Sequence, residues 1–441
     1  MSTVHANTIY ALASAAGKAG IAVFRISGAH AREALVFLGV EDALVPRMAK
    51  LVTLHHAGAK IDQALALYFP APHSFTGEDV VELHSHGSRA VTRLLLEVLS
   101  HCPGLRMAEP GEFARRAFTN GKLDLAQVEG LADLIDAETA SQHRQAMRQL
   151  GGDTTQRVEA LRMAILEPLA LMEAYIDFPD EEIPESVLRE SSERVTSLAR
   201  QIEALLNDDG IGEKIRDGLD IVILGAPNAG KSSLLNALAK RDAAIVSEEA
   251  GTTRDLIEVP MEIGGYAVTL VDTAGIRETS GSIEAEGIRR ALHRAEHADI
   301  TLRLSDITTI AAEARSIAAE LNDSSIVIAT KADLAPLPAL PFPVLALSTS
   351  TGAGIPELLA ALKEKVAKRM DSVASPLITR ARHRAALKEA LACLSQFRPA
   401  APLELTCEEL RMAAQSIGKI TGKIWVDDVL DLVFSRFCIG K

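Results

Sequence analysis

Short apolar runs separated by turn residues dominate the chain up to about residue 119. Strand-like runs of this kind predict strands at 9–13, 21–26, 51–55, 64–69 and 80–84. Helical spacing occurs at 29–38 and 89–99, while Gly77-Glu78-Asp79 and Pro110-Gly111-Glu112 have the composition of turns or helix starts. Residues 1–119 are therefore predicted to form an α+β domain.

The pattern becomes helical from about residue 120 to 217, and again after Pro376. Leu125, Val128, Leu131 and Ile135 recur every three or four residues and form one apolar stripe. Further helices are expected at 158–174, 186–206, 380–394, 407–417 and 427–437. We therefore predict one helical domain composed of residues 120–217 and 376–441.

Between these helical stretches, residues 218–375 alternate strands with helices. Apolar strands are expected at 221–224, 268–271, 300–304, 325–328 and 344–347. Such alternation is typical of a doubly wound parallel sheet with helices on both faces. The predicted fold is a multidomain α/β protein in which this sheet is inserted into the helical domain and preceded by the α+β domain.

The first of these strands runs into a phosphate-binding loop. The loop reads Gly225, four further residues and then Gly230-Lys231-Ser232, and a helical pattern follows. Its glycines let backbone N–H groups and a helix N-terminus point at a polyphosphate. The lysine is expected to reach the β- and γ-phosphates, and the serine hydroxyl to ligate Mg²⁺. The residues assigned to nucleoside triphosphate binding here are Asn228, Ala229, Gly230, Lys231, Ser232 and Ser233.

Two later motifs favour GTP over ATP. Asp272-Thr273-Ala274-Gly275 follows an apolar strand, where a carboxylate orders the Mg²⁺ shell and an N–H group meets the γ-phosphate. Thr330-Lys331-Ala332-Asp333 follows another strand, and its carboxylate can accept hydrogen bonds from two guanine donors that adenine lacks. Thr330 stands where asparagine is usual, so a slightly looser base pocket is expected. Ser348 is expected in a further base-contacting loop, and together these motifs predict a P-loop GTPase domain with a Ras-like sheet.

Hydrolysis requires groups beyond nucleotide binding. The segment Gly251-Thr252-Thr253-Arg254-Asp255 contains a switch threonine, assigned to Thr253, that is expected to ligate Mg²⁺ in the triphosphate state. Ile276 follows Gly275 and cannot orient a water molecule, and no arginine is obviously placed as a finger. The residues alone leave the source of the additional positive charge open.

The overall charge limits the partners of the protein. A formal net charge of −13 over 441 residues argues against broad, non-specific attraction to nucleic acid or anionic membranes, but it leaves room for a local basic patch. Two basic clusters either form solvated helix faces or contact RNA phosphates, and they comprise Arg380, Arg382, His383 and Arg384, and Arg115 and Arg116.

Four scattered cysteines, no signal-like N-terminus and no apolar run long enough to span a bilayer predict a soluble cytoplasmic protein.

A set of motifs spread along the chain points to one family. They are the segments 225–233 and 250–255, the terminal Phe437-Cys438-Ile439-Gly440-Lys441, and the segments 24–28, 72–79, 110–113, 120–125 and 176–179. Together they closely resemble the MnmE (TrmE) family of tRNA-modification GTPases. The resemblance covers essentially the whole chain, and the terminal motif is specific.

The resemblance implies that a K⁺ ion replaces the arginine finger. The K⁺ ligands that it implies are Asn228, Ser247, Glu249 and Thr252. A fixed cation near the bridging oxygen would stabilise the charge that develops there. The water-orienting residue maps onto Glu284, although without the family this residue reads as an exposed acid at a helix start. Activation in the family follows K⁺-dependent pairing of two GTP-bound domains.

The resemblance also implies a folate site and protein partners. The N-terminal domain of the family binds a 5-formyl- or methylene-tetrahydrofolate and forms a constitutive homodimer, with contacts that map onto Arg25, Glu82, Lys122 and Lys441. A carboxylate suits the pterin donors, and cations suit the glutamate tail. With an FAD-bearing partner of the MnmG (GidA) type, the family adds an aminomethyl or carboxymethylaminomethyl group to C5 of the wobble uridine, U34, of certain tRNAs.

Cys438 allows two interpretations. It is either a reactive thiol that serves the modification reaction or a structural cysteine packed against the helical domain. Two other classes of function also remain: a GTPase switch in ribosome assembly, and a folate-dependent transferase in which GTP is only structural.

Overall fold

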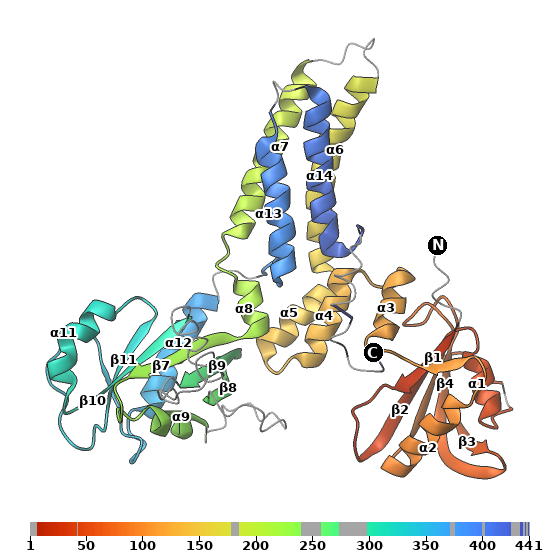
Figure 1. The fold of residues 1–441 in the computed structure, drawn as a ribbon, viewed down its shortest axis with the longest axis horizontal. Helices are drawn as coiled ribbons and strands as arrows, with labels where there is room; N and C mark the ends of the chain where they lie inside the picture. Colours follow the sequence, from red (N-terminus) through yellow and green to blue (C-terminus); the bar gives the residue numbers. More distant parts are fainter. Residues whose placement is uncertain are drawn as a thin grey trace, which may run out of the picture. The chain divides into compact units, whose positions relative to one another are not determined.

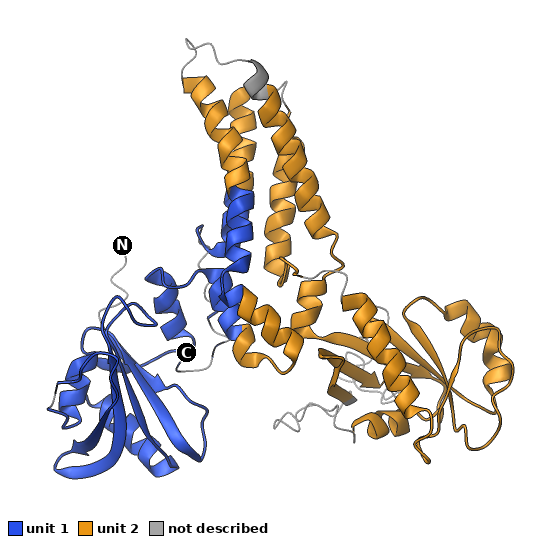
Figure 2. Cartoon of the chain, turned by 180° about the vertical axis from the view of Figure 1, so that it is seen from behind, with its two compact units in different colours: residues 1–132, 149–162, 415–441 blue, residues 133–148, 163–414 orange. Residues whose placement is uncertain are grey.

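A computed structural model of the chain is drawn in Figure 1. It describes residues 7–41, 43–177, 185–239, 257–272, 298–370, 375–398, 402–424, 433–434, 437 and 440. The chain divides into two compact units, coloured separately in Figure 2. Unit 1 comprises Met1–Ala132, Gln149–Arg162 and Gln415–Lys441, and unit 2 comprises Asp133–Arg148 and Met163–Ala414.

Unit 1 contains a six-stranded sheet in the order β3-β4-β5-β2-β1-β6. Its strands are β1 (Thr8–Leu12), β2 (Ala19–Ser27), β3 (Lys50–His56), β4 (Ala59–Phe69), β5 (Val80–Gly87) and β6 (Leu105–Met107). Neighbouring strands are antiparallel, except that β1 and β6 are parallel. Alternate side chains of each strand point to opposite faces, so the two faces have different environments.

One face of this sheet forms the main core of unit 1. Helices α1 (Ala31–Phe37) and α2 (Arg89–Ser100) cover it, and Leu95 of α2 packs in the same cluster as Phe24 and Leu83. On the opposite face, Phe113 of α3 (Glu112–Thr119) packs against Ile9 of β1. The alternation within β2 therefore places Phe24 in the core and Arg25 on the face that α3 partly covers.

Unit 2 contains a second six-stranded sheet, in the order β12-β11-β10-β7-β9-β8. Its strands are β7 (Leu219–Gly225), β8 (Ile257–Ile263), β9 (Tyr266–Asp272), β10 (Ile300–Asp306), β11 (Ser325–Thr330) and β12 (Leu345–Ala346). All neighbouring pairs are parallel except β8 with β9. Parallel strands end at the same edge of a sheet, so β7, β9, β10 and β11 end at one edge.

Helices cover both faces of this second sheet. Apolar side chains of α9 (Lys231–Ala239) and α12 (Ile355–Met370) share a core with β7 and β10. Helix α11 (Ile310–Glu320) packs on the other face, where Ile310 and Ile317 meet Val327 of β11. This is the doubly wound arrangement that the sequence predicts.

The remaining described helices are α4 (Leu125–Asp136), α5 (Ala140–Leu150), α6 (Asp153–Asp177), α7 (Glu185–Leu206), α8 (Ile211–Asp217), α13 (Ala381–Gln396) and α14 (Leu403–Thr421). Helices α7 and α13 lie side by side in both views (Figures 1 and 2). None of the described helices is long and apolar enough to cross a membrane.

Helix α8 leads directly into β7 and is fixed by polar contacts. Gln142 and Gln145 of α5 donate side-chain hydrogen bonds to the carbonyls of Arg216 and Gly212, at 2.9 and 2.8 Å. Arg384 of α13 forms an ion pair of 2.8 Å with Glu213. The strand that ends in the phosphate-binding loop therefore starts from a helix that is anchored on both sides.

The predicted fold class is confirmed, with several elements that the patterns did not locate. Strands β6 and β8 and helices α3, α5 and α8 were not expected as elements of their own. Strand β8 contains the exposed Pro260, which a sheet tolerates at an edge. The domain boundaries at 119, 217 and 375 stay predictions, and most of the expected helix 427–437 lies outside the described residues.

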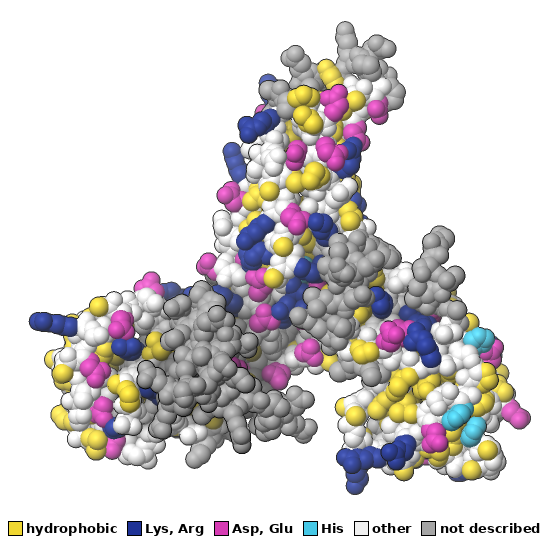
Figure 3. All heavy atoms as spheres, viewed as in Figure 1, with side chains coloured by type: hydrophobic (Ala, Val, Ile, Leu, Met, Phe, Trp, Pro, Cys, Tyr) yellow, Lys and Arg dark blue, Asp and Glu magenta, His cyan; other side chains and the backbone are white. Residues whose placement is uncertain are grey.

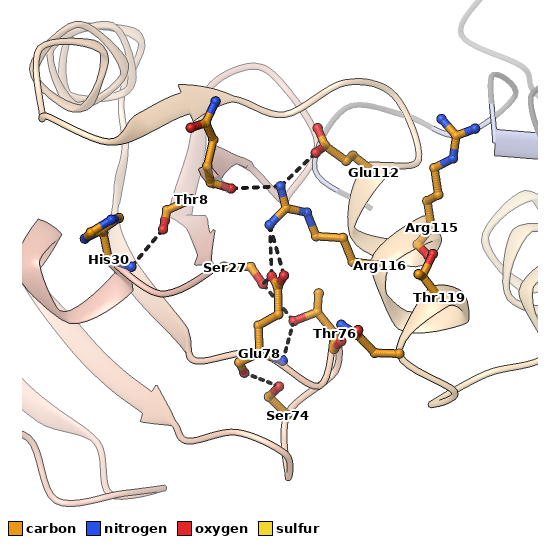
Figure 4. A network of polar contacts seen from close by, with 12 residues as sticks. Thr8, Ser27, His30, Ser74, Thr76, Glu78, Glu112, Arg115, Arg116 and Thr119 are labelled. Atoms are coloured by element: carbon orange, nitrogen blue, oxygen red, sulfur yellow. Dashed lines mark hydrogen bonds and ion pairs between the residues drawn. The ribbon is translucent and has the colours of Figure 1, made fainter. Parts of the chain in front are cut away.

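A buried network of charges joins α3 to the loop between β4 and β5 (Figure 4). Arg116, which is 1% exposed, donates to Glu78 at 3.0 Å and to Glu112 at 2.9 Å. Glu112 also pairs with Arg106 at 2.5 Å. Burial opposes the ionisation of Glu112, but hydrogen bonds led by the one from Arg106 lower its pKa below the ordinary value. The carboxylate therefore stays charged beside Arg116.

The same network fixes the loop itself. Ser27 of β2 donates to Glu78 at 2.7 Å, and its hydroxyl also lies 2.7 Å from that of Thr76. Asn120, just after α3, donates to the Thr76 carbonyl at 2.7 Å. The loop is thus fixed by both the sheet and the end of α3 (Figure 4).

We predict that Arg116→Met lowers the free energy of unfolding by about 3–5 kcal/mol, because two carboxylates would lose their buried cation. Urea denaturation followed by circular dichroism measures this loss. Arg411→Met is the matched control, since Arg411 pairs with Glu173 and Glu408 at the surface and its removal should leave stability almost unchanged. Equal, small effects of both substitutions would contradict a structural role for the network.

Candidate functional site

The phosphate-binding loop connects β7 to α9 at the edge where the parallel strands end. A Cβ at Gly225 would collide with the carbonyl oxygen of Leu304 in β10, so only glycine allows the strands to approach this closely. Gly230 has φ 89°, in the left-handed region. Asn228 also has a positive φ, of 63°, which asparagine tolerates better than most residues. The loop therefore has the compact turn that the motif predicts.

Lys231 lies within the curve of this loop. Its Nζ donates to the carbonyls of Gly225 and Ala226 at 2.7 and 2.9 Å. The residue is 7% exposed, so the ammonium is held at the inner side of the loop. A positive charge at this place, beside a helix N-terminus, favours a polyphosphate.

Ser232 and Asp272, both of which the sequence assigns to the Mg²⁺ shell, lie in contact. The Ser232 hydroxyl, in the first turn of α9, donates to Asp272 Oδ2 at the end of β9, at 2.9 Å. Asp272 is 1% exposed. A hydroxyl and a carboxylate are hard oxygen ligands of the kind that Mg²⁺ takes in nucleotide sites. Of the other residues assigned to this loop, Ala229 is buried and Ser233 is exposed on α9.

Thr330 connects the phosphate-binding loop to two neighbouring strands. Its hydroxyl lies 2.8 Å from the carbonyl oxygen of Ala229 in the loop and 3.2 Å from that of Ser305 in β10. Thr330 ends β11 and is 2% exposed. The threonine that replaces the usual asparagine therefore fixes the position of the loop, a role that the sequence analysis did not anticipate.

The residues after Thr330 present charged groups beyond the end of β11. Lys331 has φ 58° and pairs with Asp306 at 2.6 Å. The hydrogen bond from Lys331 is the main reason that the pKa of Asp306 falls from 3.8 to about 2. A hydrogen bond from Ser348 lowers the pKa of the exposed Asp333. Asp333 and Ser348, which the sequence assigns to base contacts and which lie 15 positions apart, are thus brought together.

Three of the four residues that the resemblance assigns to folate lie near one loop of unit 1. Arg25 donates to Glu82 Oε1 at 2.9 and 2.8 Å. Lys122 donates to the carbonyl of Pro72 at 3.0 Å. The guanidinium of Arg25 also lies over the ring of Phe75, 5.3 Å from its centroid. Pro72 and Phe75 belong to the loop between β4 and β5, which the buried charge network fixes.

The aromatic contacts of Arg25 were not predicted from the sequence. Phe113 of α3 is the second ring, 5.7 Å from the guanidinium. Both phenylalanines lie within the segments 72–79 and 110–113, which carry the family resemblance, so the signal was present in those motifs. The pairing of Arg25 with two rings depends on contacts between distant segments, which local patterns do not specify.

Ten of the expected site residues lie outside the described part of the chain. They are Ser247, Glu249, Thr252, Thr253, Thr273, Ala274, Gly275, Glu284, Cys438 and Lys441. Their assignments to the K⁺ site, the Mg²⁺ shell, the γ-phosphate, water activation, the modification reaction and the folate site stay predictions.

Comparisons with known proteins cover almost the whole chain. The model of the GTP-binding protein TrmE N-terminus matches residues 8–122, and that of the MnmE helical domain matches residues 125–438. A tRNA modification GTPase MnmE from Paramagnetospirillum magneticum is 51% identical over 439 residues, which cover 98% of this chain and 99% of the relative. A protein of the same name from Parvibaculum lavamentivorans is 50% identical over 440 residues, covering 98% and 100%.

The two family models together span residues 8–438, apart from residues 123 and 124. Since about half of all positions are identical over nearly the full length of both chains, this protein belongs to the MnmE family of tRNA modification GTPases.

Proposed function

We propose that this protein is a cytoplasmic, K⁺-stimulated GTPase that drives modification of the wobble uridine, U34, of certain tRNAs. Together with an FAD-dependent partner of the MnmG (GidA) type, it adds an aminomethyl or carboxymethylaminomethyl group to C5. A tetrahydrofolate derivative, 5-formyl or methylene, supplies the carbon, ammonium or glycine supplies the amine, and the partner supplies the redox chemistry. The observation that carries this proposal is the joining of Ser232 to Asp272 beside Lys231, within a chain of this family.

Different residues of the phosphate-binding loop would contact different parts of the triphosphate. Backbone N–H groups from Asn228 to Ser233 would cradle the phosphates, and Lys231 would move from the loop carbonyls onto the β- and γ-phosphate oxygens. Ser232 would ligate Mg²⁺, with Asp272 orienting the ion's shell and Thr253 completing it in the triphosphate state. Thr273, Ala274 and Gly275 would line the γ-phosphate.

Guanine selectivity would come from the residues after β11. The exposed carboxylate of Asp333 is oriented by Ser348 and can accept hydrogen bonds from N1–H and the 2-amino group of guanine. Lys331 is held by Asp306 at the same edge, and its stem can cover the plane of the base. Thr330 supports this arrangement through the contact of its hydroxyl with the carbonyl of Ala229.

A bound K⁺ would provide the positive charge that hydrolysis needs at the bridging oxygen. Asn228 supports this role, because its left-handed backbone places an exposed amide side chain at the turn of the phosphate-binding loop. Ser247, Glu249 and Thr252 would complete the ligand set, and Glu284 would orient the attacking water. Pairing of two GTP-bound domains would close the site.

The folate site would use the residues gathered around the β4–β5 loop. Glu82 can accept from the pterin ring, and Arg25, Lys122 and Lys441 can bind the carboxylates of the glutamate tail. Phe75 and Phe113 bracket Arg25 and offer aromatic surface beside the pterin. Cys438 would serve the modification reaction near this site.

A homodimer would bury the open face of the first sheet. Leu51 of β3 is paired across the strands with Leu65 of β4, and Leu65 with His84 of β5. Leu51 is 65% and Leu65 43% exposed. Exposed apolar side chains in one row on a sheet face favour association with another surface. The row lies next to Arg25 and Glu82, so a second copy would cover the edge of the folate site.

We predict that replacing K⁺ by Na⁺ slows GTP hydrolysis at least about tenfold, because the smaller ion fits the ligand set less well. Asn228→Ala should abolish the K⁺ response while GDP still binds. Phosphate release measured in matched KCl and NaCl buffers tests both statements. The control Asn236→Ala removes an exposed amide on α9 and should retain the response. A wild-type rate that is the same in both salts would contradict the K⁺ mechanism.

Asp272→Ala distinguishes coupled hydrolysis from a folate-dependent transferase with a structural GTP. Loss of this carboxylate should lower the hydrolysis rate by about 100-fold or more, because the Mg²⁺ shell is no longer oriented. Nucleoside analysis of bulk tRNA from a deletion strain carrying the variant should show loss of the C5 substituent at wobble uridines. Asp323→Ala, which removes an exposed carboxylate before β11, should restore modification fully. Modification that persists without hydrolysis would favour the transferase.

A further inference from the structure

A hollow in unit 1 lies apart from both proposed sites. It has a volume of about 540 Å³ and is lined by Leu12 and Ala16 on one side and by Arg89, Thr92, Arg93 and Leu96 of α2 on the other. We call it the α2 hollow. It lies on the side of the sheet that α2 covers, whereas Arg25 and Glu82 project from the opposite face. The folate residues therefore do not line it.

The charges that line the α2 hollow oppose the stability of their own helix. Arg89 is the first residue of α2 and Arg93 lies four residues further, so two like charges face each other one turn apart. Both are near the helix N-terminus, where the helix dipole favours acids, and the first turn contains no acidic residue. The hydroxyl of Ser88 caps the helix by accepting from the Val91 amide at 3.1 Å. Nothing in this turn neutralises the arginines.

Within the described residues, the side chains of Arg89 and Arg93 form no hydrogen bond and no ion pair, not even with Glu97, which lies one turn beyond Arg93 on α2. Several other arginines of the chain have internal acidic partners. Arg116 pairs with Glu78, and Arg384 pairs with Asp208 at 2.7 Å. Although the chain has a formal net charge of −13, the two exposed arginines make the α2 hollow locally positive.

An anionic ligand would offset both the repulsion between the two arginines and their unfavourable interaction with the helix dipole. A negative group between Arg89 and Arg93 would relieve their repulsion and would also interact favourably with the N-terminus of α2. Four residues of a helix advance about 6 Å, so the two guanidiniums can reach consecutive phosphates of one nucleic-acid strand. The Thr92 hydroxyl between them is a further donor, and Leu12 and Leu96 offer apolar surface to a ribose.

We propose that the α2 hollow binds the phosphate backbone of the tRNA substrate. Arg89 and Arg93 form charge-assisted hydrogen bonds to adjacent phosphates, and Lys18, directly after Gly17 of the hollow, adds a third positive charge. Backbone contacts of this kind position an RNA without reading its sequence. The inference rests on the proposed function, because it takes tRNA as the substrate.

The test is the salt dependence of tRNA binding by the full-length chain. Fluorescence anisotropy with labelled tRNA is recorded over a series of NaCl concentrations at fixed K⁺, for the wild type and the double variant Arg89→Gln/Arg93→Gln. We expect the double variant to bind about tenfold more weakly at low salt. The slope of log affinity against log salt should become shallower by about 1–2, because each lost phosphate contact removes about 0.7–0.9. GTP hydrolysis should not change, and the melting temperature should stay the same or rise slightly, because the substitutions remove the repulsion between the two arginines of α2.

A second double variant, Lys60→Gln/Arg144→Gln, removes the same net charge at exposed positions outside the hollow and should bind tRNA like the wild type. Equal weakening by both double variants, or an unchanged slope for the first, would overturn the inference. Titration with inorganic phosphate separates the sources of the anion. If the wild type binds phosphate saturably, the arginine double variant does not, and both bind tRNA equally, then the hollow is a site for free phosphate. That result would also overturn the inference. Absence of tRNA binding by the wild type would contradict the proposed function itself.

Discussion

The phosphate-binding loop depends on being held from three neighbouring strands at once. Gly225 lets the loop pass against the carbonyl of Leu304 in β10. Thr330 at the end of β11 reaches back to Ala229, and Ser232 is joined to Asp272 at the end of β9. Because each contact comes from a different parallel strand, the groups that would meet phosphate, metal and base are placed by the sheet rather than by the loop alone.

Contacts between distant segments also determine the roles of the charged residues. Arg116 and Arg384 are used inside their own units, where they hold loops and helices in place. The buried Arg116 constrains the geometry around it strongly, because removing it would leave carboxylates without their compensating charge. Arg25 pairs with Glu82 and lies beside aromatic rings, an arrangement that keeps a cation ordered before a ligand arrives. Cations that lack such partners, as at the α2 hollow, are therefore the ones available to a polyanion.

Local motifs were sufficient to predict the strand–loop–helix of the phosphate site and the doubly wound sheet, because both depend on short-range spacing. The contact of Thr330 with Ala229 joins residues 101 positions apart, and no local pattern specifies it. The interpretation of the basic clusters stayed open for the same reason. Arg116 and Arg384 find acidic partners in distant segments, and the partner of Arg384, Glu213, belongs to a helix that the patterns did not locate. Strand β8 was not predicted because it contains Pro260. A sheet tolerates proline in an edge strand, and the local sequence does not show that β8 lies at the edge.

We expect the edge of the second sheet at which β7, β9, β10 and β11 end to select guanine nucleotide. Isothermal titration of the full-length chain with GDP and with ADP, in the presence of Mg²⁺, measures this selectivity. GDP should bind at least about 100-fold more tightly than ADP. Asp333→Asn should transfer the preference from GDP to xanthosine diphosphate, whose base offers an acceptor where guanine has an amino donor. Equal affinities for GDP and ADP, or a preference that Asp333→Asn leaves unchanged, would contradict this expectation.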